Sequence, residues 1–149
     1  MKDPFRSPED YELYLYSLRE LYPSIKHSTV IMVRRGSSLA RVTGELVFDG
    51  TIRLVMRERL VLDRRPIALD WYGYEVWHGT GKLYWYDSQP HPHDPHLQET
   101  HPHHKHVPPN PKHNRVPAVG LAFEQPNVQF LIQEIEELIA IMFSNGSYD

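Results

Sequence analysis

The sequence predicts a single α+β domain, with an antiparallel meander sheet of about five strands flanked by an N-terminal and a C-terminal helix. The 149 residues are enough for one core and short for two. Helical spacing of apolar residues occurs near the two ends, and alternating segments with turn signals occupy the middle. We therefore place one domain over residues 1–149, with a long His- and Pro-rich loop at 87–117.

The N-terminal helix carries clear start and stop signals. Ser7 is a favoured N-cap residue, and Pro8 suits the first helical position. Pro23 ends the helix. The apolar residues that recur at helical spacing are Tyr11, Leu15, Leu18 and Tyr22.

Five segments read as strands: 29–34, 39–48, 51–62, 68–77 and 82–86. The Asp49-Gly50 pair is a strong hairpin signal between the second and third segments. With a two-residue turn there, Phe48 faces Thr51, and Arg41 lies directly across from Glu58.

Residues 87–117 fit neither a helix nor a central strand, because their prolines remove backbone donors. A loop of this length in a compact domain is usually functional or disordered. The C-terminal helix is expected at about 126–143, with Pro126 in its first turn. Its apolar stripe consists of Phe130, Ile135, Leu138, Ile139 and Met142.

Composition narrows the class of protein. The chain contains no cysteine, which excludes disulfide frameworks and thiolate metal sites and makes the cytoplasm the expected location. No apolar run approaches the roughly 18 residues of a membrane-spanning helix, so no membrane association is expected.

Charge is distributed unevenly along the chain. Residues 26–65 carry nine Lys or Arg against four acidic residues, whereas residues 120–149 carry five acidic residues and no Lys or Arg. The basic segment fits either a surface that faces a polyanion or a solvated sheet face near an acidic helix. Four arginines are candidate substrate-binding residues on the first interpretation: Arg41, Arg53, Arg57 and Arg59.

Glu58 interrupts the apolar face of the third strand. The even positions from 52 to 62 are otherwise apolar, so strand alternation places the Glu58 carboxylate among them. Such a carboxylate must be paired, hydrogen-bonded or shifted in pKa, and groups of this kind concentrate at active sites. The alternatives are a cross-strand ion pair with Arg41 and a bulge at Gly44 that shifts the strand phase.

Aromatic residues crowd the fourth and fifth strands. Tyr72 and Tyr74 share one face. They fit either core packing or the stacking of nucleobases beside the arginines, and the sequence does not separate the two.

Eight of the ten histidines lie between His91 and His113. One interpretation is metal binding, although ligands scattered on a loop favour adventitious transition-metal binding over a designed site. The second is acid–base catalysis, because clustered cations hold imidazole pKa values near neutrality. A neutral and a protonated imidazole together can cleave RNA without metal, with Lys105 or an arginine stabilising the charge on the phosphate. The third is a solvated low-complexity loop.

The compact block Pro102-His103-His104-Lys105-His106, with Tyr86-Asp87 and Pro90-His91 upstream, resembles the TumE family of small toxins from prokaryotic toxin–antitoxin pairs, formerly a domain of unknown function. The resemblance covers roughly residues 28–142, and Glu58 fits its pattern. It implies a toxin neutralised by a co-encoded antitoxin, often a small DNA-binding protein. This chain departs from the pattern by a longer spacer and four additional histidines, which are the least expected to be catalytic: His93, His96, His101 and His113.

The sequence thus predicts a toxin that is a metal-independent endoribonuclease, with RNA as substrate and no cofactor. Glu58 and Asp87 would orient or activate a histidine. The candidate catalytic residues are Glu58, Asp87, His91, His103, His104, Lys105 and His106. Two alternatives are a non-enzymatic module that binds a metal or a protein partner, and a toxin that modifies nucleotides or protein.

Overall fold

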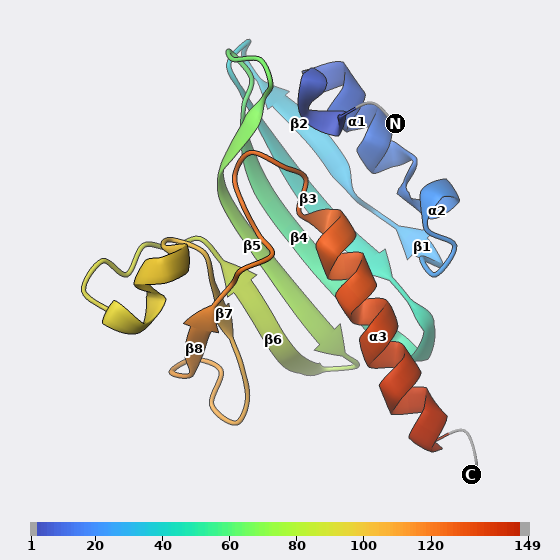
Figure 1. Ribbon diagram of the computed structural model, residues 1–149. Coiled ribbons are helices and arrows are strands. Elements are labelled where there is room, and N and C mark those ends of the chain that lie inside the picture. The colour runs from blue at the N-terminus through green and yellow to red at the C-terminus, as the bar shows by residue number, and fades with distance from the viewer. Residues whose placement is uncertain (1–2, 147–149) are drawn as a thin grey trace.

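The computed structural model describes residues 3–146, so the ends of the expected domain, 1–2 and 147–149, lie outside the described residues. It has one antiparallel sheet with its long helices on one side (Figure 1). The predicted α+β class and antiparallel sheet are confirmed. The predicted count of about five strands is wrong, because the sheet has eight strands within residues 3–146.

The N-terminal segment contains the 3₁₀ helix η1 (Pro4–Arg6) and the helices α1 (Pro8–Tyr16) and α2 (Leu18–Leu21). The Ser7 hydroxyl caps α1 by accepting a hydrogen bond from the Asp10 amide at 3.1 Å. The predicted single helix is broken at Ser17, whose hydroxyl donates to the Leu13 carbonyl at 2.7 Å. Such back-bonding bends helices, and the chain restarts as α2.

The strands pair in the order β1-β3-β4-β5-β6-β7-β8, and β2 also pairs with β3. Their bounds are β1 (His27–Ser28), β2 (Ile31–Arg35), β3 (Leu39–Val47), β4 (Ile52–Val61), β5 (Ala68–His78), β6 (Gly81–Asp87), β7 (His104–His106) and β8 (Arg115–Pro117).

Two features explain the additional strands. The first predicted strand, 29–34, corresponds to β2, and β1 is an additional strand before it. Between the two, the chain lies against Gly44, where a Cβ would be 2.5 Å from the Val30 Cα. The expected loop contains β7, β8 and the 3₁₀ helix η3 (Pro95–Thr100). β7 lies in the proline-free run that precedes Pro108, and Pro117 is tolerated because β8 lies at the sheet edge.

The predicted pairing of Arg41 with Glu58 is wrong by one residue. Arg41 lies opposite Arg59, and Val42 lies opposite Glu58. The turn has three residues, η2 (Asp49–Thr51), with Gly50 and Thr51 both at positive φ, and the Phe48 amide donates to the Ile52 carbonyl at 2.8 Å. A positive φ at threonine is uncommon, so the sequence alone favoured the shorter turn.

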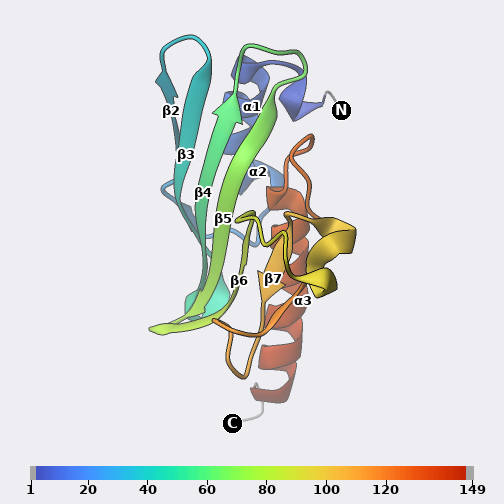
Figure 2. The ribbon, with the colours of Figure 1, turned by 90° about the vertical axis from the view of Figure 1, so that its left-hand side faces the viewer.

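The sheet has a core face, to which the even residues of β4 point, and an outer face, to which the odd residues point. The helices lie against the core face (Figure 2). α3 (Val128–Gly146) begins two residues after the predicted start, because the Asn127 carbonyl accepts its first bond, from Leu131. Among the described residues, no helix has the length and apolar character needed to cross a membrane.

Candidate functional site

Sheet register assembles one row of residues across the outer face. Arg57 lies opposite Gly73, Gly73 opposite Asp87, and Asp87 opposite His104. Side chains alternate along β7, so His106 shares the outer face with His104, while Lys105 points to the core face.

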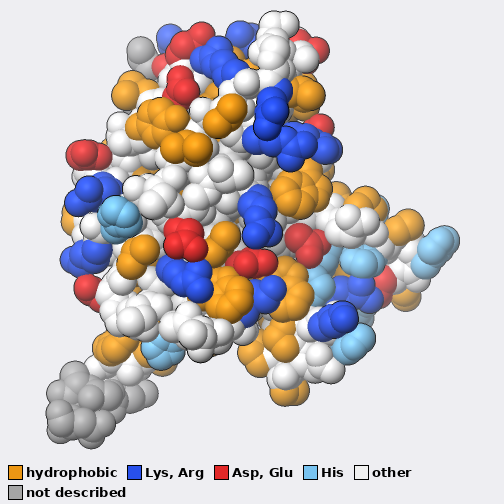
Figure 3. Space-filling model, turned by 180° about the vertical axis from the view of Figure 1, so that it is seen from behind, with side chains coloured by type: hydrophobic (Ala, Val, Ile, Leu, Met, Phe, Trp, Pro, Cys, Tyr) orange, Lys and Arg blue, Asp and Glu red, His pale blue; other side chains and the backbone are white. Residues whose placement is uncertain are grey.

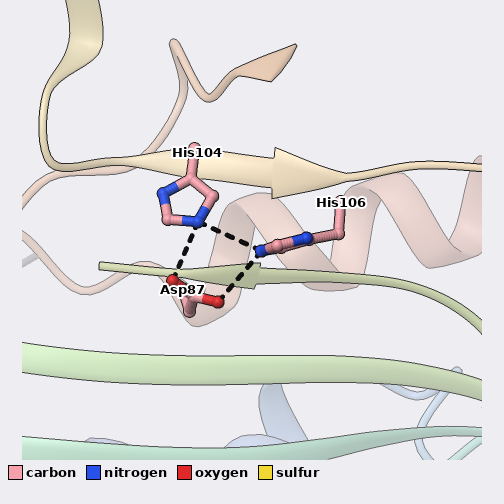
Figure 4. A group of neighbouring side chains, drawn as sticks. All are labelled: Asp87, His104 and His106. Carbon is pink, nitrogen blue, oxygen red and sulfur yellow. Dashed lines mark hydrogen bonds and ion pairs between the residues drawn. The ribbon is translucent and has the colours of Figure 1, made fainter. Parts of the chain in front are cut away.

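Asp87, His104 and His106 form a compact cluster, hereafter the Asp87 cluster (Figure 4). The His104 Nε2 lies 2.9 Å from the Asp87 Oδ1, and the His106 Nε2 lies 3.2 Å from the Asp87 Oδ2. The two Nε2 atoms are 3.1 Å apart. His104 and His106 are 1% and 7% exposed, whereas the Asp87 side chain is 23% exposed, so the cluster is open on its carboxylate side.

Backbone carbonyls fix both imidazole rings. The His104 Nδ1 lies 3.0 Å from the Pro102 oxygen, and the His106 Nδ1 lies 2.7 Å from the Pro111 oxygen. A carbonyl oxygen can only accept, so each Nδ1 carries the hydrogen and donates it. The Trp85 ring stacks on His106, with centroids 4.3 Å apart. Both Nε2 atoms are therefore held toward Asp87.

These contacts shift the pKa values of Asp87 and His104. Burial alone would raise the pKa of Asp87, but the hydrogen bonds from His104 and His106 hold the pKa of this carboxyl well below its usual range. Burial disfavours charge on His104, yet the bonds to Asp87 and to the Pro102 carbonyl raise the pKa of His104 above its ordinary value. The cluster is thus an anionic carboxylate held against imidazole.

His91 borders this cluster. Its ring lies edge to face with that of His104, with centroids 4.9 Å apart. The Arg115 guanidinium donates to the His91 Nδ1 at 2.9 Å, and burial together with Arg115 lowers the pKa of His91. A neutral His91 therefore lies at the rim.

A pocket of about 340 Å³ lies beside Asp87 on the outer face. Gly73 forms its floor, and because this residue has no side chain, the space between Arg57 and Asp87 stays open. The pocket is lined by Arg57, Trp71, Gly73, Tyr74, Glu75, Trp85, Tyr86, Asp87 and Gln89.

The four predicted arginines all lie on the outer face, where basic and acidic side chains are interspersed (Figure 3). Arg53 is paired with Glu45 at 2.9 Å, and Arg59 with Asp70 at 2.6 Å. Arg41 and Arg59 line a separate pocket at the Arg41 end of the sheet.

Arg57 differs from Arg53 and Arg59 in its surroundings. Its side chain is 56% exposed, and the distance to its acidic neighbour Glu75 is 4.0 Å. Arg57 is therefore the arginine that is both beside the Asp87 pocket and loosely paired.

Glu58 lies on the core face, away from the Asp87 cluster. It is 2% exposed, and the hydroxyls of Tyr11 and Tyr74 donate to its two oxygens, each at 2.5 Å. Burial raises the pKa of Glu58, although the two tyrosine bonds act in the opposite direction. The predicted burial of Glu58 among apolar residues is confirmed, but the sheet separates it from His104 and His106.

Two further predicted residues also lie away from the cluster. The Lys105 Nζ lies 3.3 Å from the Glu134 Oε2 on α3 and 4.3 Å from the centre of the Tyr84 ring. The His103 Nδ1 lies 2.6 Å from the Tyr72 hydroxyl, and burial lowers the pKa of His103.

Tyr72 and Tyr74 are packed in the core, each with an exposed fraction of 0%. Their rings offer no surface on which a nucleobase can stack, so core packing is their role in this structure. Of the aromatic residues that line the pocket, Trp71 and Trp85 have their side chains on the outer face.

The predicted site residues did not include three residues that line the pocket: Gly73, Trp71 and Trp85. Two signals were present: a glycine inside an aromatic strand indicates close approach by another group, and alternation places Trp71 on the face of Arg57 and Arg59.

Comparison with known proteins agrees with the resemblance noted in the sequence. The family model of toxin TumE matches residues 15–141, most of the chain. A search of curated proteins and a search of solved structures found no match. The chain therefore belongs to the TumE toxin family, and this membership implies a toxin of a toxin–antitoxin system with an antitoxin partner.

Proposed function

We propose that this toxin is an endoribonuclease that cuts RNA at the outer face of the sheet. The observation that carries the proposal is the row formed by Arg57, Gly73 and Asp87, with His104 behind the carboxylate. It places a cation at one side of an open pocket and the Asp87 cluster at the other.

Cleavage of RNA by its own 2′-hydroxyl has simple requirements. The 2′-oxygen bonds to phosphorus, the bond to the 5′-oxygen breaks, the hydroxyl loses its proton, and the leaving oxygen gains one. The reaction therefore needs a group that takes the proton from the hydroxyl, a group that gives a proton to the leaving oxygen, and positive charge beside the phosphate. The Asp87 cluster is positioned to exchange the two protons, and Arg57 to supply the positive charge.

The pocket also suits a nucleotide. Trp71 leans over Gly73, since its Cη2 atom is 3.6 Å from the position that a Cβ on Gly73 would take. Indole rings stack on nucleobases without sequence preference. Trp71 is thus our candidate for holding the base next to the scissile phosphate.

An RNA substrate makes the cytoplasm the place of action. The antitoxin would neutralise the toxin by covering the pocket or by keeping the toxin away from RNA. Its nature as a small DNA-binding protein is part of the proposal and follows from the family resemblance alone.

The test compares two carboxylates of the outer face. Wild-type protein, Asp87→Asn and Asp70→Asn are induced in cells without the antitoxin, while growth and RNA 5′ ends are followed. Asp70 pairs with Arg59 outside the Asp87 cluster, so it serves as the matched control. We expect Asp87→Asn to reduce cleavage by about 10²–10⁴-fold and Asp70→Asn to leave it nearly unchanged.

Two outcomes contradict the proposal. Full RNA cleavage by Asp87→Asn excludes the cluster from the reaction. Growth arrest by the wild type with intact RNA excludes the nuclease and favours a toxin that modifies nucleotides or protein, which mass spectrometry of both pools would identify.

A further inference from the structure

We propose that Asp87, His104 and His106 bind one divalent transition-metal ion. Three distances connect their four ligand atoms: 2.9 Å from the His104 Nε2 to the Asp87 Oδ1, 3.1 Å between the two Nε2 atoms, and 3.2 Å from the His106 Nε2 to the Asp87 Oδ2. Two ligand atoms that each lie about 2.1 Å from an ion, at about 90–110° to one another, are about 3.0–3.4 Å apart. The spacing in the cluster is therefore close to that of adjacent ligands on one ion.

Hydrogen-bond accounting supports a cation at the centre. Because each Nδ1 donates to a backbone carbonyl, the neutral form of each ring leaves a lone pair on Nε2. Two such lone pairs then face each other and two carboxylate oxygens, which are also acceptors. One added proton, on His104, leaves the His106 Nε2 lone pair against the Asp87 Oδ2 at 3.2 Å, and a second added proton places two cations 3.1 Å apart. One divalent ion satisfies all of the acceptors.

The tautomer and orientation of both imidazole rings are also fixed, as they are for histidine ligands in known metal sites. Histidine ligands commonly donate their second ring nitrogen to a carbonyl or carboxylate, which fixes the tautomer and the orientation of the ring. Here the Pro102 and Pro111 carbonyls have that role, and stacking on Trp85 restrains His106. Positions 104 and 106 share one strand face, so β7 supplies two ligands without strain.

The donor set narrows the class of ion. Two imidazole nitrogens and one carboxylate suit zinc, iron(II), nickel or cobalt, whereas magnesium and calcium prefer oxygen ligands. Three protein ligands leave coordination positions for water. Asp87 is the exposed ligand and lines the pocket over Gly73, so the open side of the ion faces that pocket.

This proposal replaces the expectation of metal-free chemistry. It rests on donor geometry and does not need RNA to be the substrate. If the proposed nuclease is correct as well, a phosphate oxygen held between Arg57 and Asp87 can take one of the open positions on the ion.

The remaining histidines create a competing explanation for any metal binding. Four exposed side chains of the same segment can bind transition metals adventitiously: His93, His96, His101 and His113. They provide a matched control, because replacing these four histidines removes more imidazoles than replacing His104 and His106 does, and it leaves the Asp87 cluster unchanged.

The experiment measures metal binding on the purified full chain in the absence of RNA. After dialysis against a chelator, Zn²⁺ is titrated by calorimetry and Co²⁺ by visible absorption. The proteins are the wild type, Asp87→Asn, His104→Gln with His106→Gln, and a loop variant with all four exposed histidines changed to Gln. We expect one tight equivalent in the wild type and loop variant, and a loss of about 10–100-fold in affinity in Asp87→Asn.

Either of two results would overturn the metal site: no tight equivalent in the wild type, or loss of binding in the loop variant with full binding in Asp87→Asn. Asp87→Asn is nearly isosteric and partly exposed, so it remains informative if the double histidine variant does not fold. Wild-type protein that binds one ion and leaves RNA intact refutes the nuclease and supports the metal site.

Discussion

Two carboxylates of the same sheet, Glu58 and Asp87, have opposite surroundings. Glu58 is on the core face and receives two phenol hydroxyls, from Tyr11 and Tyr74. Asp87 is on the outer face and meets two imidazole nitrogens beside an open pocket. Burial raises the pKa of Glu58, whereas hydrogen bonds from His104 and His106 lower the pKa of Asp87. A perturbed carboxylate therefore does not by itself mark a reactive site; its partners and its access to solvent do.

The comparison is tested most strongly by removing the Glu58 side chain. Glu58→Ala leaves two buried tyrosine hydroxyls without their acceptor and opens a cavity, which we expect to lower the free energy of unfolding by about 3 kcal/mol. Urea denaturation measures the change. The control Glu45→Ala breaks only the surface pair with Arg53 and is expected to cost less than about 1 kcal/mol. Equal losses in the two variants would contradict a structural role for Glu58.

Filling the pocket probes the Asp87 side of the comparison. Gly73→Val adds a branched side chain between Arg57 and Asp87 and is expected to reduce RNA cleavage about tenfold by displacing the substrate. Valine suits a strand, so the unfolding midpoint should not fall. Gly73→Ala is the matched control, because its Cβ would make only an ordinary contact with Trp71 at 3.6 Å. Unchanged cleavage by Gly73→Val would place the substrate elsewhere.

The smallest expected effect is the pH dependence of stability that arises from Glu58. Its folded-state pKa is raised above the ordinary 4.5, so the folded protein binds this proton more tightly than the unfolded chain does. The contribution to stability is complete below pH 4.5 and is lost as pH rises through the folded-state pKa. Thermal melts from pH 4 to 8 should therefore show a shallower decline for Glu58→Gln than for the wild type. Parallel curves would mean that Glu58 does not titrate differently on folding.

Strand alternation predicted the burial of Glu58, because a period of two is a local property. The same alternation places Arg53, Arg57 and Arg59 on the opposite face, whereas the predicted pairing put Arg41 on the face of Glu58. The register between β3 and β4 was not predictable, since it depends on a positive φ at Thr51. The sequence did not predict that His104, Lys105 and His106 alternate between two faces, because the surrounding prolines indicated a loop. Once β7 pairs with β6, that alternation separates the predicted block into two outward-facing histidines and an inward-facing lysine.

The Asp87 cluster is built from parts of the chain that are synthesised at different times. Asp87 ends β6, whereas the two histidines belong to a three-residue strand that follows η3. During synthesis, the residues of β3 to β6 leave the ribosome before residue 104 does. Asp87 meets the two histidines only after the loop between β6 and β7 has closed, which costs chain entropy. A chain truncated before β7 lacks both imidazoles of the Asp87 cluster, and it also lacks α3, whose Val128, Leu131, Ile132 and Ile135 are buried in the core. The same C-terminal part of the chain therefore completes both the Asp87 cluster and the hydrophobic core.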